Sequence, residues 1–154
     1  MNIPSALLDF LAKNQIDYEI LPHAEAFTAR MAAAAEDIPR RHQAKVVMVG
    51  CQEGPLMTVV PADRQLDLRK LERLTGERAS LQSEKEFAPF FPDCAPGAMP
   101  PFGNLYGFPT YVDQHLAEED YIVFEAGTYT EAIKLGYRDY ERVVKPQVAD
   151  LAIG

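Results

Sequence analysis

The stretch from Pro96 to Gly103 has the composition of a loop that could hold a ligand. It contains three prolines and two glycines in eight residues. Proline fixes φ and removes a backbone donor, whereas glycine permits positive φ and close approach of a ligand. Such a loop can hold its backbone N–H groups in a fixed array around an oxygen. The same composition suits a rigid connector between a short helix and a strand, so both interpretations are open from these residues alone.

Lys45 is the second candidate, because it stands at the start of an otherwise apolar stretch that continues through residues 46–49. An ammonium group on a pocket wall can pair with a phosphate or a polarised oxygen. A lysine at a strand start can equally extend its aliphatic stem to water. In the same way, His23 fits a surface turn and Asp113 fits the end of a strand.

The signatures of the common catalytic classes are missing from the sequence. It has no G-x-S-x-G, H-E-x-x-H, G-x-x-x-x-G-K-[ST] or G-x-G-x-x-G motif. The three histidines (His23, His42 and His115) have no ligand-like spacing, and Cys51 and Cys94 do not form a C-x-x-C pair. We therefore expect chemistry without a metal, a cofactor or an activated side-chain nucleophile.

Length and composition indicate one domain of an ordinary globular protein. The chain has 154 residues, of which 47% are hydrophobic and 25% charged. No apolar run approaches the ~18 residues of a membrane span, so no membrane partner is expected. The start lacks the basic region of a secretory signal, and the two cysteines read as reduced thiols. These features predict a cytoplasmic protein.

The charge balance limits how the chain could meet nucleic acid. Fifteen Lys and Arg residues against 23 Asp and Glu residues give a net charge of −8, which does not attract nucleic acid by its overall field. Any contact with RNA must then rest on a local basic patch or on the reading of one end of the molecule. One place that a phosphate could touch is the basic run at residues 40–42. The other is the mixed predicted helix, whose net charge is only +1 because it carries Arg64, Arg69, Lys70, Arg73 and Arg78 together with Asp63, Asp67, Glu72 and Glu77.

The candidate residues must be positioned by strands and helices. The order expected for these elements predicts an α+β domain with a mixed sheet, because strands in runs and pairs are separated by helices. The pattern of apolar residues, caps and breakers predicts strands at 18–21, 44–51, 56–60, 111–113, 121–126 and 129–135. Helices are expected at 3–13, from Thr28 to before Pro39, at 67–75, after a capping box at 83–86, and at 137–144.

Taken in chain order, these features resemble the YbaK/prolyl-tRNA synthetase-associated domain family, the freestanding aminoacyl-tRNA editing domains. The matching segments span nearly the whole chain: the leader helix, 18–23, the alanine-rich helix after Thr28, 43–47, 61–63, 96–103, 111–113 and 124–128. The resemblance implies a single editing domain over residues 1–154. Its fold would be α+β, with a mixed, strongly curved, barrel-like sheet flanked by helices.

The resemblance also implies a reaction. It is the hydrolysis, in trans, of the ester that joins a wrong, small amino acid to the 3′ end of a tRNA. Such editing corrects what a synthetase pocket cannot reject, since one methylene is worth only ~1–3 kcal/mol. In this family a hydroxyl of the terminal ribose helps to activate water, with no protein nucleophile and no metal. The implied partners are the acceptor end of an aminoacyl-tRNA and, as for some family members, an aminoacyl-tRNA synthetase.

Carried over position by position, Lys45 matches the family's lysine and is expected to contact the terminal nucleotide or its phosphate. The family's G-x-x-x-P loop falls on residues 97–101, whose backbone groups would hold the aminoacyl carbonyl and exclude larger side chains. We therefore predict Lys45, Gly97 and Pro101 as catalytic residues. The substrate-binding residues implied by the same comparison are His23, Thr28, Met31, Ala98, Met99, Pro100, Phe102 and Gly103.

One departure from the family pattern leaves alternatives open. Many relatives carry a histidine where this chain has Tyr129. Tyr129 and the acidic composition favour a second hypothesis, a non-catalytic module of the same fold that binds a synthetase or a nucleotide. A third is a hydrolase of a different small ester. The amino acid removed stays open among alanine, serine, cysteine and threonine, because the packing of Met31, Met99 and Phe102 sets the pocket volume.

Overall fold

The computed structural model describes residues 2–23 and 38–154. The helices are α1 (Ser5–Lys13), α3 (Leu68–Thr75), α4 (Glu84–Phe87), α5 (Gln114–Ala117) and α6 (Tyr137–Val144), with 3₁₀ turns η1 (Arg40–His42), η2 (Ala88–Phe90) and η3 (Gly103–Leu105). The strands are β1 (Tyr18–Pro22), β2 (Ala44–Cys51), β3 (Gly54–Pro61), β4 (Gln65–Leu66), β5 (Ala79–Leu81), β6 (Thr110–Asp113), β7 (Tyr121–Glu125), β8 (Glu131–Gly136), β9 (Gln147–Ala149) and β10 (Ala152–Ile153).

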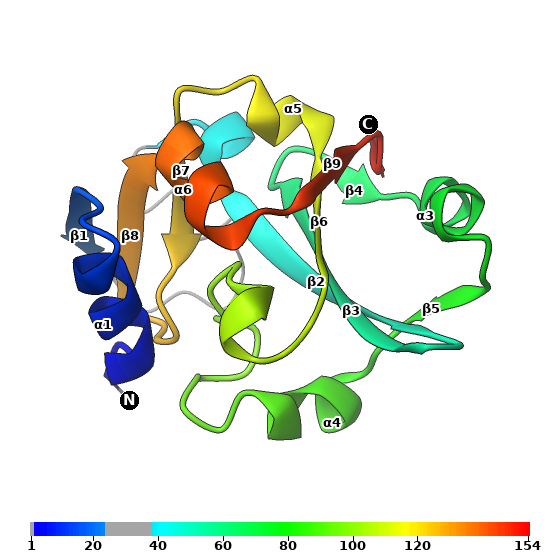
Figure 1. The fold of residues 1–154 in the computed structure, drawn as a ribbon, viewed down its shortest axis with the longest axis horizontal. Helices are drawn as coiled ribbons and strands as arrows, with labels where there is room; N and C mark the ends of the chain where they lie inside the picture. The colour runs from blue at the N-terminus through cyan, green and yellow to red at the C-terminus, as the bar shows by residue number, and fades with distance from the viewer. Residues whose placement is uncertain (1, 24–37) are drawn as a thin grey trace.

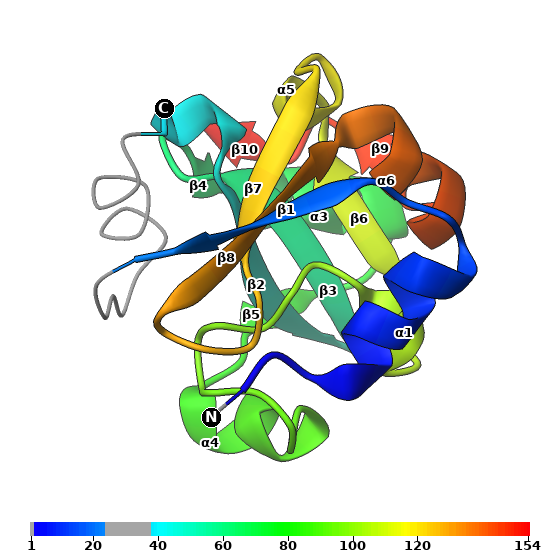
Figure 2. The same cartoon turned by 90° about the vertical axis from the view of Figure 1, so that its left-hand side faces the viewer.

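The described strands form three sheets (Figure 1). The largest has the order β5-β2-β3-β6-β9, the second β1-β8-β7, and β10 pairs with β4. The pairs β3–β6 and β6–β9 are parallel and the others within the sheets are antiparallel, so the expected α+β class with a mixed sheet is confirmed. These strands do not close into a barrel, and the barrel-like curvature stays a prediction. In Figure 2 the three-stranded sheet lies in front of the five-stranded one.

The five-stranded sheet is buried on both faces, which explains the continuous apolar run of β2. Ala44 and Met48 point into a first core that contains α1, the three-stranded sheet and α6. Val47 and Val49 point to the opposite face, toward a second core formed with α3 and the C-terminal residues. Because successive side chains of a strand alternate between faces, Lys45 leaves β2 on the side of the second core.

Local signals in the sequence explain where several elements begin and end. Ser83 caps α4 in the expected capping box, with Glu86 bonded back to the Ser83 N–H. Gly76 ends α3 in the left-handed region, at φ 75°. The strand expected from Tyr129 begins only at Glu131, because residues 126–130 form a turn closed by a hydrogen bond from the Ala126 N–H to the Glu131 carbonyl.

One expected helix and two candidate residues lie outside the described part of the chain. They are the helix expected after Thr28, and the residues Thr28 and Met31. Across residues 2–23 and 38–154, no helix has the length and apolar character required to cross a bilayer.

Asp113 holds the C-terminal segment against the end of β6. Its side chain is fully buried, and Oδ1 accepts hydrogen bonds from the Leu151 and Ala152 N–H groups at 2.9 and 3.0 Å. Oδ2 accepts the His115 N–H at 3.1 Å and lies 2.7 Å from His115 Nδ1. Asp113 is therefore more than the strand end expected from sequence, because it joins β6, α5 and the last strand at one buried carboxylate.

Candidate functional site

The start of β2 lies beside the middle of β7, and the two strands then separate. Gln43, the residue before β2, forms a parallel bridge with Val123 in the middle of β7. Beyond this bridge β2 pairs with β3 and β5, whereas β7 pairs with β8 along its whole length. Bridged residues of parallel strands point to the same face. Two positions further along each strand, Lys45 and Glu125 therefore leave toward the same side. We call this region, between residues 43–46 of one strand and 123–125 of the other, the β2–β7 wedge.

Lys45 stands on one side of the β2–β7 wedge. Its side chain is half-buried, and this burial lowers the pKa of its ammonium group below the usual lysine value. Among the described residues, no carboxylate forms an ion pair with Lys45. The arrangement therefore offers a partly dehydrated cation to an anionic ligand.

On the other side of the β2–β7 wedge, Glu125 lies against His23. The Glu125 Oε1 and His23 Nε2 atoms are 3.2 Å apart, and the two side chains are 9% and 0% exposed. The His23 N–H donates to the Thr130 carbonyl at 2.9 Å, which ties the chain after β1 to the turn before β8. The structure thus adds Glu125 to the candidate residues. The signal in the sequence is a carboxylate at the end of an apolar strand.

The glycine–proline loop is fastened to the turn that follows β7. The Ala95 N–H donates to the Gly127 carbonyl and the Gly127 N–H donates to the Ala98 carbonyl, both at 2.8 Å. The Tyr140 hydroxyl donates to the Pro101 carbonyl at 2.6 Å. Because both hydrogen bonds of Gly127 attach the loop next to Glu125, the loop lies at the end of β7 where the wedge is widest.

Tyr129 also contributes to this fastening. Its hydroxyl donates a hydrogen bond to the Pro96 carbonyl. Tyr129 therefore ties the exposed start of the loop to the turn after β7.

The loop has a buried part and an exposed part. Residues 98–103 are buried, and the side chains of Met99 and Phe102 belong to the first core. Since Lys45 leaves β2 on the opposite face, the structure does not bring those two side chains to the Lys45 ammonium group. Pro96 and Gly97 are exposed, and Gly97 has φ +85°, a conformation that favours glycine. The exposed part is therefore where a ligand can meet the loop backbone.

Two glycines of the loop give a matched test of packing. A Cβ on Gly103 would lie 2.3 Å from Thr110 Oγ1 and 2.8 Å from the Phe108 carbonyl oxygen, whereas a Cβ on Gly97 meets nothing within 4 Å. We expect Gly103→Ala to lower the free energy of unfolding by about 2–3 kcal/mol through overpacking. Gly97→Ala should cost only about 1 kcal/mol, through its positive φ. Urea denaturation of both variants measures this, and equal losses would contradict the packing argument.

Neither cysteine has the character of an activated nucleophile. Burial raises the pKa of Cys94 to about 12, and its Sγ lies 3.3 Å from the Tyr106 hydroxyl. Burial, followed by the nearby Glu77 and Glu72 carboxylates, raises the pKa of Cys51. Both thiols therefore stay protonated at neutral pH, in agreement with the packing role expected from sequence.

One group of potential metal ligands occurs within the described residues, formed by His42, Glu119 and Asp120. His42 stacks on the Tyr121 ring at 3.9 Å and its Nδ1 lies 3.0 Å from the Tyr121 carbonyl oxygen. Glu119 lies 3.6 Å from both His42 Nε2 and Arg41 Nε. These contacts explain the group as the attachment of η1 to the start of β7.

Residues 23–143 match the family described as the aminoacyl-tRNA editing domain. This chain belongs to that family. The matched range includes the β2–β7 wedge and the glycine–proline loop, so the family expected from sequence is confirmed. The enzyme class expected with it, an aminoacyl-tRNA deacylase, is confirmed as well.

The editing domain is similar to two curated bacterial proteins. EbsC of Enterococcus faecalis, which bears the name of a Cys-tRNA(Pro)/Cys-tRNA(Cys) deacylase, is 24% identical over 136 residues, or 88% of this chain and 83% of EbsC. ProXp-y of Escherichia coli, named a multifunctional Ser/Thr-tRNA deacylase, is 33% identical over 97 residues. That alignment covers 62% of this chain and 58% of ProXp-y.

Solved structures show the same fold. A crystal structure described as a trans-editing enzyme for prolyl tRNA synthetase superposes with a TM-score of 0.84 at 25% identity, and each chain is covered completely. The crystal structure of hypothetical protein APE2540 gives a TM-score of 0.88 at 18% identity, covering 97% of this editing domain and 100% of that chain. The second likeness concerns the fold alone.

Proposed function

We propose that residues 1–154 act as one trans-editing domain that hydrolyses the ester between a small amino acid and the 3′-terminal adenosine of a tRNA. The observation that carries this proposal is the β2–β7 wedge. There, a half-buried ammonium group without an ion pair among the described residues shares a face with Glu125, and the loop is tied to the end of β7. The arrangement offers a cation on β2 for a phosphate, and exposed loop backbone at the end of β7 for a carbonyl.

In this proposal the protein positions the reactants and water does the cleavage. Lys45 binds the phosphate of the terminal nucleotide, and the loop of residues 97–101 holds the aminoacyl carbonyl, which approaches it from the exposed Gly97 end. A free hydroxyl of the terminal ribose orients the water and relays a proton, accepting one from the water while it donates its own to the ribose oxygen of the ester. The water oxygen adds to the ester carbon, the bond to the ribose oxygen breaks, and that oxygen takes up a proton. The products are the free amino acid and the uncharged tRNA, and no step requires a metal.

Most of the remaining candidate residues stabilise the elements that form this site. Ala98, Met99, Pro100, Phe102 and Gly103 are buried and keep the shape of the loop. His23 supports Glu125 from the side. Thr28 and Met31 lie outside the described residues and stay candidates through the family resemblance alone. The names of the two relatives, which mention cysteine, serine and threonine, support a small aminoacyl group as the substrate.

The test is a panel of charged tRNAs. We expect hydrolysis of at least one tRNA carrying alanine, serine, cysteine or threonine, and at least tenfold slower hydrolysis of leucyl- and phenylalanyl-tRNA, about the discrimination that ~1.4 kcal/mol provides. A terminal adenosine that lacks the free ribose hydroxyl should be cleaved about 10²-fold more slowly, if that hydroxyl assists the water. Binding of a synthetase without hydrolysis of any member of the panel would instead support the adaptor hypothesis.

A further inference from the structure

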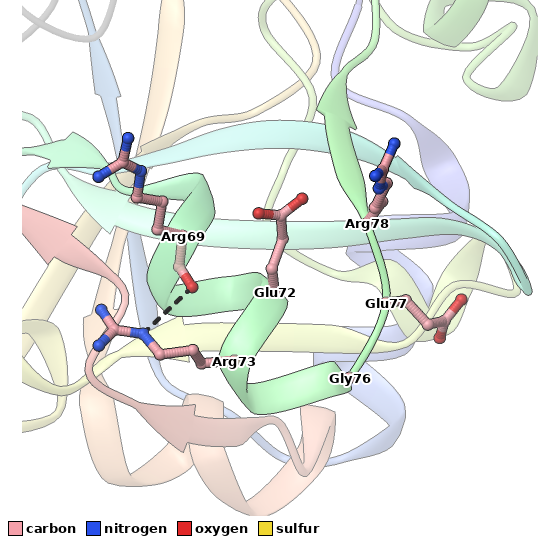
Figure 3. A pocket seen from close by; sticks show the side chains of 6 residues that line it. All are labelled: Arg69, Glu72, Arg73, Gly76, Glu77 and Arg78. Carbon is pink, nitrogen blue, oxygen red and sulfur yellow. Dashed lines mark hydrogen bonds between the residues drawn. The ribbon is translucent and has the colours of Figure 1, made fainter.

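A second feature lies away from the wedge, between α3 and β5. It is an open groove of about 710 Å³, which we call the α3–β5 groove (Figure 3). The side chains that line it are mainly charged: Arg69, Glu72, Arg73, Gly76, Glu77 and Arg78. Three arginines against two glutamates make this lining net positive, although the whole chain carries −8.

The two carboxylates of the α3–β5 groove are already bonded to backbone groups. Glu72 Oε2 accepts the Ala79 N–H and Glu77 Oε1 accepts the Glu53 N–H, both at 2.9 Å. Both glutamates are half-buried. They hold the start of β5 against α3, and the β2–β3 turn against the residue that follows α3. Their role is therefore explained by the fold, which leaves the arginines to be explained.

The three arginines are exposed and form no ion pair with any residue in the described part of the chain. Arg73 Nε lies 3.4 Å from the Arg69 carbonyl, which leaves its terminal nitrogens unused. Figure 3 shows Arg69 and Arg73 on one side of the groove and Arg78 on the other, with Glu72 between them. Guanidinium groups present a planar set of donors that matches the oxygens of phosphate.

The α3–β5 groove and Lys45 belong to the same side of the five-stranded sheet. α3 packs on the second core through Leu71, together with Val60 of β3. Val60 is the direct partner of Lys45 across the β2–β3 pair. Paired residues of antiparallel strands point to the same face. A polyanion whose end is held at Lys45 can therefore continue along this side of the molecule.

A second pair of arginines, on α6, provides a comparison for the arginine pair on α3. Arg138 and Arg142 have the same spacing on α6 as Arg69 and Arg73 have on α3. Arg142 is already paired with Asp139 at 3.2 Å. In addition, α6 packs on the first core, through Tyr137 and Tyr140, so it lies on the other side of the sheet from Lys45.

We propose that the α3–β5 groove binds the phosphodiester backbone of the acceptor arm of the tRNA, while the 3′ end lies in the β2–β7 wedge. This inference rests on the proposed function, because it assigns the rest of the same substrate to a second surface. The phosphate contacts would supply affinity without sequence readout. They would compensate locally for the overall negative charge, which otherwise repels RNA.

The two arginine pairs give a matched experiment. Arg69→Gln/Arg73→Gln is compared with Arg138→Gln/Arg142→Gln, which removes the same charge at the same helical spacing. For aminoacyl-tRNA, the α3 double variant should raise KM about tenfold and lower the slope of log(kcat/KM) against log[salt] by about 1–2, with kcat unchanged. Both double variants should hydrolyse an aminoacyl-adenosine as the wild type does, because that substrate cannot reach the groove.

Three results would overturn the groove proposal. They are an unchanged KM and salt slope in the α3 double variant, equal effects of the two double variants, or a matching loss of activity on aminoacyl-adenosine. If the wild type hydrolyses neither substrate, the proposed function fails by itself. Binding of uncharged tRNA to the wild type and to both double variants then still tests the groove, which predicts about tenfold weaker binding for the α3 double variant alone.

Discussion

Replacing Lys45 by alanine is expected to lower kcat/KM for deacylation by about 10²–10³-fold, because it removes a charged contact to the phosphate of the terminal nucleotide from a partly dehydrated site. The half-buried ammonium group has no carboxylate partner among the described residues, so its charge is available to the substrate phosphate. Single-turnover hydrolysis of the preferred aminoacyl-tRNA measures the loss. Since Lys45 would contact the terminal nucleotide, aminoacyl-adenosine 5′-phosphate should lose as much as the full tRNA.

Lys45→Met separates this role from a role in folding. Burial lowers the pKa of Lys45 in the folded state, so the unfolded chain binds its proton more tightly. The resulting penalty on stability is fully present below the folded pKa and disappears as pH rises toward the unfolded value. At pH 7 the methionine variant should therefore unfold with a free energy equal to or above that of the wild type, while its activity is lost. A variant that is active, or that is clearly less stable, would instead support a lysine that merely extends to water.

The lowered pKa of Lys45 also predicts how kcat/KM depends on pH. Phosphate binding requires the protonated lysine, so kcat/KM should fall as pH rises through a pKa below the usual lysine value. This alkaline limb should be missing from the residual activity of Lys45→Met. If the limb persists in that variant, another group titrates and Lys45 does not hold the phosphate.

Features set by neighbouring residues could be predicted from the sequence. The capping box at Ser83, the stop of α3 at Gly76 and the β2–β3 hairpin depend on residues a few positions apart. The apolar run of β2 also predicted a buried strand, and the structure shows why, since both faces of its sheet are covered. In each case the local preference and the tertiary fold agree.

The geometry of the site could not be predicted in the same way. The wedge depends on one bridge between Gln43 and Val123, which are distant in sequence, and no local pattern encodes it. The pairing of His23 with Glu125 follows from that topology. Gly103 illustrates the converse. The family resemblance predicts it as a substrate-binding residue, and the structure adds a packing constraint, because Thr110 and the Phe108 carbonyl leave no room for a Cβ.

Asp113→Ala is expected to lower the free energy of unfolding by about 3–5 kcal/mol, since it leaves several buried donors without an acceptor. The Leu151 and Ala152 N–H groups lose their partner, and His115 loses both of its contacts. Asp150→Ala is the control. That carboxylate is 52% exposed and accepts a hydrogen bond from Lys70 Nζ at 2.8 Å, so its loss should lower the free energy of unfolding far less. Equal losses in urea denaturation would show that Asp113 does not anchor the C-terminal segment.

Asp113→Ala should destabilise α3 more than it destabilises the β2–β7 wedge. Leu151 accepts the Asp67 N–H at 2.8 Å, and Asp67 caps the helix that carries Arg69 and Arg73. Ala152 also pairs with Leu66 of β4, directly before that helix. Below its unfolding temperature, the variant should therefore exchange the amide protons of α3 faster than those of β7. Its KM for aminoacyl-tRNA should rise while its kcat/KM for aminoacyl-adenosine stays near the wild-type value. Equal protection of both elements would mean that the anchor at Asp113 and the α3–β5 groove are independent.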